Sequence, residues 1–107
     1  MSPTSAPVRL PEQVRPYRTT AEFDHHSLPQ ALRKNHSTKA GVWALIHVLE
    51  GRLRYCVPQW QLDVVLTPNA PGIVAPQVEH FVEPMGAVRL YVEFHAEPQN
   101  SPDTPHA

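Results

Sequence analysis

The sequence lacks several features that mark large classes of protein. It has one cysteine in 107 residues, so an internal disulfide and a cysteine-based zinc site are both excluded. It has only four glycines, and neither a glycine-rich phosphate loop nor a nucleophile elbow is present. No apolar run approaches the roughly 20 residues of a membrane span. A net charge of −1 argues against electrostatic binding to nucleic acid or a membrane surface. The length is that of one small domain.

The amino terminus also lacks the pattern of a secretory signal. Residues 1–13 read MSPTSAPVRLPEQ, with no basic start and no apolar segment behind it. Together with the single cysteine, this pattern predicts a cytoplasmic protein. Residues 1–8 and 97–107 are rich in small polar residues and proline, as disordered segments are. We therefore expect one domain at residues 9–96 between two disordered tails.

Proline is the residue that this chain has in quantity. Thirteen prolines exclude long helices, because a proline inside a helix costs about 3 kcal/mol. One short helix is expected at residues 28–35, where Pro29 suits the first turn. Alternating apolar residues predict strands at 42–49, 52–58, 61–67 and 88–95, with turns at Glu50-Gly51 and at 67–72. Short strands at this spacing predict an all-β fold, specifically a small antiparallel β-barrel.

Seven histidines carry most of the chemical content of this composition. His25 and His26 are adjacent in a polar loop, where two neighbouring side chains rarely bind one ion. His47 lies in an apolar strand, which favours a hydrogen-bonded core histidine over a ligand. Glu93 and His95 share the polar face of the last predicted strand, and solvent exposure is the simplest expectation for both.

His36 and His80 differ from the others because they belong to an ordered set of motifs. His36 precedes the first long strand, which ends in VLEG. His80 completes the spacing G-x3-P-x3-H, together with Gly72 and Pro76. Proline is normally confined to the start, edge or bend of a strand, so His80 follows a forced break. An early and a late strand can meet in an antiparallel barrel, so 44 residues of separation do not prevent a shared metal site.

The order of these motifs resembles that of the cupins. The nearer resemblance is to the TehB/YeaR-like cupins, a group that includes the N-terminal domain of the tellurite-resistance protein TehB. The matching stretches are LPQ (28–30), HSTKAGVW (36–43), VLEGRL (48–53), LTP (66–68) and APQVEHFVE (75–83). The resemblance spans residues 11–95 and implies a single-domain jelly roll or conical β-barrel. The methyltransferase domain that follows in full-length TehB has no counterpart in this sequence.

The resemblance also implies a metal site inside the barrel. Its ligands would be His36, His80 and Glu83, and the ion would be a divalent metal such as zinc, iron or nickel. His80 and Glu83 are three residues apart, and odd offsets point to opposite faces of a regular strand. The two would converge only through a turn or a bulge. Glu93 is the reserve ligand if Glu83 points outward.

Two departures from the family pattern keep several functions open. Thr38 stands where a second histidine is usual, and Ala44 stands where a ligand glutamate is usual. One reading is a protein that binds a metal or small ligand in the response to tellurite or another oxyanion stress. A second is a metal-dependent enzyme acting on a small molecule, and a third is a metal-free barrel that acts through association. The expected partners are a small molecule or oxyanion and a second copy of the chain in a homodimer, with no nucleic acid and no membrane.

Overall fold

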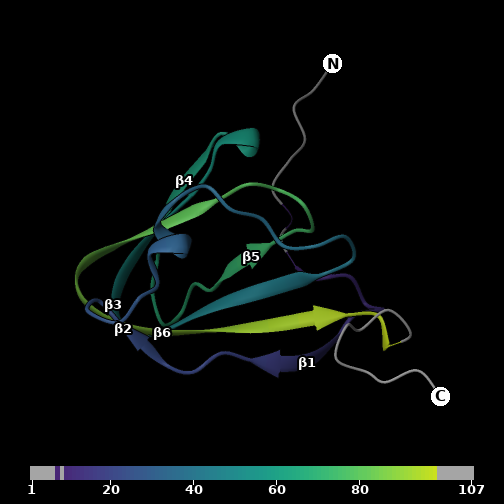
Figure 1. The fold of residues 1–107 in the computed structure, drawn as a ribbon, viewed down its shortest axis with the longest axis horizontal. Coiled ribbons are helices and arrows are strands. Elements are labelled where there is room, and N and C mark those ends of the chain that lie inside the picture. The colour runs from purple at the N-terminus through teal and green to yellow at the C-terminus, as the bar shows by residue number, and fades with distance from the viewer. Residues whose placement is uncertain (1–6, 8, 99–107) are drawn as a thin grey trace.

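The computed structural model describes residues 7 and 9–98, which form a six-stranded antiparallel sheet with two short 3₁₀ helices (Figure 1). In chain order the elements are β1 (Arg15–Thr19), β2 (Phe23–Asp24), η1 (Gln30–Arg33), β3 (Trp43–Val57), η2 (Pro58–Trp60), β4 (Leu62–Leu66), β5 (Gly72–Val74) and β6 (Phe81–Ala96). The predicted all-β class is confirmed. No helix in the described ranges is long and apolar enough to cross a membrane. The tails predicted at 1–8 and 97–107 fall almost wholly outside the described residues.

Two long strands, β3 and β6, organise the sheet by pairing along most of their length. Their register runs from Trp43 opposite His95 to Cys56 opposite Phe81. Strands β1 and β2 pair with β6, while β4 and β5 pair with β3. Figure 1 shows β6 turning back on itself, so its two halves run in different layers. Among the described residues β1 and β4 do not pair, so the sheet is open, and closure into a barrel or jelly roll stays a prediction.

The turn predicted at Glu50-Gly51 is wrong, because β3 continues through it. The register with β6 shifts between Val48 and Glu50 and again between Gly51 and Leu53. Gly51 has a φ of +81°, a conformation that glycine adopts without steric cost. Such bulges bend a strand without ending it. A bulge and a tight turn both call for glycine at positive φ, so the local sequence does not separate the two.

Most of the other predicted elements are confirmed. The short helix expected within residues 28–35 is η1, a single 3₁₀ segment. The turn expected at 67–72 contains a hydrogen bond from the Ala70 N–H to the Thr67 carbonyl, 2.9 Å long. The strand expected at 88–95 is the second half of β6, which begins earlier, at Phe81.

The hydrophobic core lies against the inner face of the β3–β6 pair. Alternate residues of the two strands are buried there: Ala44, Ile46, Val48, Leu53, Tyr55, Val57, Val82, Val88, Leu90 and Val92. The alternation follows from the two-residue period of a strand, which sends neighbouring side chains to opposite faces. Part of this apolar face also forms the wall of a cavity.

Candidate functional site

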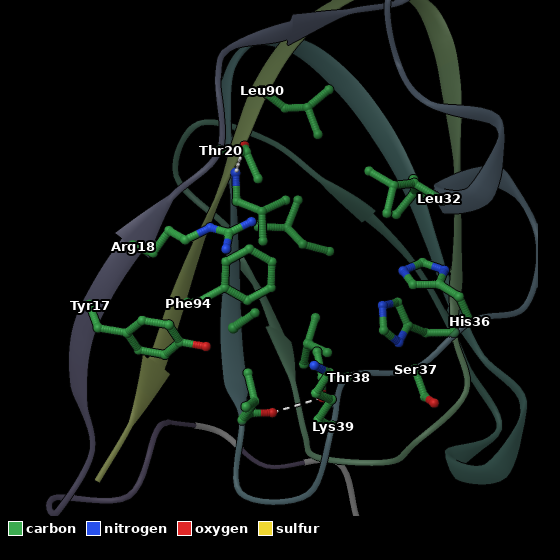
Figure 2. Close-up of a pocket in the computed structure, with 17 residues that line it drawn as sticks. Tyr17, Arg18, Thr20, Leu32, His36, Ser37, Thr38, Lys39, Leu90 and Phe94 are labelled. Carbon is green, nitrogen blue, oxygen red and sulfur yellow. Dashed lines mark hydrogen bonds between the residues drawn. The ribbon is translucent and has the colours of Figure 1, made fainter. Parts of the chain in front are cut away.

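A cavity of about 400 Å³ lies on the inner face of the sheet. Its apolar wall comes from β3, β5 and β6, and its polar side chains come mainly from β1 and from residues 36–39. Figure 2 shows Tyr17 and Arg18 on one wall, His36 on the facing wall and Phe94 between them. A volume of a few hundred Å³ with few polar groups is typical of small-molecule sites.

The backbone brings His36 and His80 together at the edge of this cavity. The N–H of His36 donates to the carbonyl of His80 at 3.0 Å, and the reverse bond is 2.9 Å long. One step further, the N–H of Gln77 donates to the carbonyl of Thr38 at 3.1 Å. The break at Pro76 therefore turns the chain so that residues 76–80 lie beside residues 36–38. The two imidazole centroids are 4.1 Å apart.

In both histidines one ring nitrogen donates a hydrogen bond and the other carries a lone pair. Nδ1 of His36 donates to the carbonyl of Lys34, and Nδ1 of His80 donates to the carbonyl of Val78, both at 3.0 Å. A carbonyl only accepts, so each Nδ1 carries the proton and each Nε2 carries a lone pair. Neither Nε2 has a hydrogen-bond partner among the described residues. The pair thus presents two imidazole lone pairs.

His80 is kept neutral by its surroundings. Its side chain is buried, with 4% of the residue exposed. Burial is the main cause that lowers the pKa of His80, to about 4, and the neighbouring His36 lowers it further, against the opposing effect of the bond to Val78. At neutral pH the imidazole is therefore an acceptor at Nε2 and not a cation.

Glu83 lies on the other face of β6 from His80. Val82, between them, is buried in the core and lines the cavity, whereas Glu83 pairs across the sheet with Arg54 and accepts a hydrogen bond from Arg54 Nη1. Arg54 also donates to both carboxylate oxygens of Asp63, at 3.0 and 2.7 Å. The odd offset in a strand thus separates Glu83 from the histidine pair. Within the described ranges, no three His, Cys, Asp or Glu residues form a group that could hold a metal ion.

Sequence reasoning missed the cationic residues of the cavity. Arg18 and Lys39 both line it, and no Asp or Glu is among the described lining residues. Arg18 is opposite Phe94 in the β1–β6 register, and its guanidinium carbon is 5.8 Å from the centre of that ring. Lys39 follows His36 in the stretch HSTK, so this signal was present in the sequence. Arg18 could not be found, because the five-residue strand β1 has too little alternation to reveal its inward face.

Glu93 is not in the cavity but at the centre of a second cluster, on the opposite face of β6. Its Oε1 accepts hydrogen bonds from Nε2 of His95, at 2.8 Å, and from Nε2 of His47, at 3.5 Å. His47 also stacks on Tyr91, with ring centres 4.8 Å apart. Burial raises the pKa of Glu93, but the bonds from His95 and His47 outweigh it and lower the pKa overall. His47 is hydrogen-bonded as predicted, but it is half-buried on the outer face and not part of the core, and His95 is buried rather than solvated.

The family model of the TehB-like domain matches residues 18–92. This chain belongs to the TehB-like domain family. The match covers well over half of the chain and includes the end of β1 from Arg18, both halves of the β3–β6 pair as far as Val92, and the cavity-lining segment at 36–39. The resemblance predicted from the motif order is confirmed at this level.

Two solved structures share the fold of this TehB-like domain. TehB from Haemophilus influenzae has a TM-score of 0.73 and 24% identity, over 80% of this chain and 32% of TehB. This TehB-like domain therefore spans about a third of that relative. A protein from Escherichia coli strain K12 has a TM-score of 0.74 and 17% identity, over 85% of this chain and 98% of its own. No curated protein matches the sequence significantly.

Proposed function

We propose that this TehB-like domain binds a small anionic molecule in the cavity on the inner face of its sheet. The observation that carries the proposal is the charge of the lining: Arg18 and Lys39 are present, and none of the described lining residues is acidic. A concave site lined by one sign of charge concentrates ligands of the opposite sign. Tellurite is the first oxyanion to consider, because the family resemblance implies a link to tellurite resistance.

The polar groups of the cavity support an anion in different ways. Arg18 and Lys39 are exposed, so they lie where a charged group can enter from solvent. Arginine binds carboxylates and other oxyanions through its planar array of N–H donors. Ser37 adds a hydroxyl to the same lining. The neutral His80 adds no charge, so the two cations carry the electrostatic attraction.

Replacing Arg18 with methionine is expected to weaken anion binding at least about tenfold, since a hydrogen bond to a charged group contributes about 1.5–3 kcal/mol. Titration calorimetry with tellurite, phosphate and acetate measures the effect. Arg52→Met is the matched control, because Arg52 is exposed and does not line the cavity. The proposal fails if Arg18→Met and Arg52→Met bind these anions equally, or if the unaltered protein binds none of them.

A divalent metal at the histidine pair is the second candidate. Both Nδ1 atoms are held by backbone carbonyls, an arrangement common in metal-binding histidines, and both Nε2 lone pairs are available. Imidazole nitrogens are suitable ligands for zinc, iron or nickel, but zinc sites in proteins usually have three or four protein ligands. His36 and His80 supply two, and Glu83 is engaged by Arg54. A metal-dependent enzyme would need further ligands from a bound molecule.

If the pair binds zinc, zinc added to metal-free protein at pH 7.5 raises its melting temperature. His36→Ala and His80→Ala should each abolish that rise, because one remaining imidazole holds zinc weakly. His26→Ala is the control, since His26 is exposed and outside the cavity. A zinc-dependent rise that persists in both cavity variants would place the metal elsewhere.

We also propose that the domain forms a homodimer. Strand β4 has only one strand partner in the described part of the chain, β3, and two of its valines are notably exposed, Val64 at 37% and Val65 at 42%. Unpaired strand edges bearing apolar side chains favour association with another strand. This supports a dimer through β4 as the form in which the domain acts.

A further inference from the structure

The cavity is chemically divided along its length. Figure 2 shows Leu90 and Leu32 toward one end, Ser37, Thr38 and Lys39 toward the other, and Arg18 and His36 on facing walls between them. The apolar end adjoins the buried core, because Leu90 is 1% exposed, and Leu32 beside it is half-buried. The polar end is formed by Ser37 and Lys39, which are exposed, and by Thr38, which is half-buried. A ligand that fills the cavity therefore meets positive charge from the polar end to the middle, and hydrocarbon at the other end.

The volume argues against a bare inorganic oxyanion as the sole occupant. About 400 Å³ corresponds to roughly a dozen water molecules, each taking about 30 Å³ of liquid volume. An oxyanion of a few atoms would meet the cations and leave the half-buried part of the apolar wall, at Leu32 and Phe94, in contact with water. Apolar surface gains free energy when it is removed from water, so a ligand with a hydrocarbon part binds this wall better.

We propose that the ligand is a small organic acid with an apolar body of several carbon atoms. Its acidic group lies near Arg18 and Lys39, and its hydrocarbon part lies against Leu32 and Leu90. The inference rests on the anion site proposed above and adds the chemical class and the orientation of the ligand. The absence of Asp and Glu from the described lining disfavours a cationic ligand of the same size.

The test is a series of straight-chain carboxylates, from acetate through butanoate and hexanoate to octanoate. Titration of the unaltered protein at constant ionic strength should give about fourfold tighter binding for each added methylene, until the cavity is full. Alkylammonium ions of the same lengths should bind at least tenfold more weakly than the carboxylates. Equal binding of the two series, or affinity independent of chain length, would overturn the organic-acid inference.

The inorganic anions separate this inference from the proposed function. If tellurite and phosphate bind through Arg18 while the carboxylates show no gain with length, the anion site stands and the organic acid is wrong. If no anion binds, both the proposed anion site and the organic-acid inference are wrong. A second variant, Leu32→Trp, places a larger side chain at the apolar end, and it should reduce hexanoate binding to the level of acetate. Acetate binding by this variant, at unchanged strength, shows that it is folded; unchanged hexanoate binding in it would contradict the proposed orientation.

Discussion

Replacing Gly51 with alanine is expected to reduce the free energy of unfolding by about 3 kcal/mol. A β-carbon built at this position would lie 2.1 Å from the carbonyl oxygen of Ala87 and 3.1 Å from the Cα of Val88. Both are backbone atoms, so neither can rotate away. The φ of +81° adds the cost of a left-handed conformation, about 1–2 kcal/mol for an alanine. Urea unfolding monitored by circular dichroism measures the change.

Gly86→Ala is the matched control for this prediction. Gly86 also has a positive φ, +86°, but a β-carbon there would have no atom within 4 Å. The loss of unfolding free energy in Gly86→Ala should therefore be limited to the conformational cost, about 1–2 kcal/mol. The difference between the variants isolates the close approach of β3 and β6 at the bulge. Equal losses would mean that the two strands do not approach closely at Gly51.

The second large effect is a loss of stability in mild acid caused by His80. The pKa of His80 is lowered to about 4 in the fold, mainly by burial, against about 6.5 when the chain is unfolded. Between these two pKa values the unfolded chain therefore binds more protons than the folded protein does. The stability of the folded protein consequently falls as pH falls. The stabilising contribution is complete above about pH 7. About 2 kcal/mol is lost by pH 5, and about 3 kcal/mol by pH 4.

His80→Gln removes this titration, and its free energy of unfolding should vary less between pH 7.5 and 5 by about 2 kcal/mol. Chelator-treated protein is used, so that metal does not compete with protons. His26→Gln is the control, because His26 is exposed and its variant should keep the full dependence on pH. Pairs of urea titrations at pH 7.5 and 5 give the comparison. The same dependence in His80→Gln as in the unaltered protein would exclude a buried neutral His80.

The candidate site was partly within reach of the sequence. The order of motifs pointed to His36 and His80, and the structure places their rings 4.1 Å apart. The same reasoning flagged the odd offset from His80 to Glu83 as an obstacle. The obstacle is real, because β6 is already regular at Glu83 and Arg54 lies opposite it. Arg18, by contrast, lines the cavity because β1 pairs with β6, and no local sequence pattern predicts that pairing.

The sequence by itself determined the β class, the short helix near Pro29, and the period that buries one face of β3 and β6. These are local properties, set by proline geometry and by the alternation of apolar side chains. Only the tertiary structure decided that β3 passes through Gly51 as a bulge, that Glu93 bonds both His47 and His95, and that Arg18 joins Lys39 in the lining of the cavity. Each of these depends on register between segments distant in the chain, and a shift of one residue would reverse the face of every side chain involved.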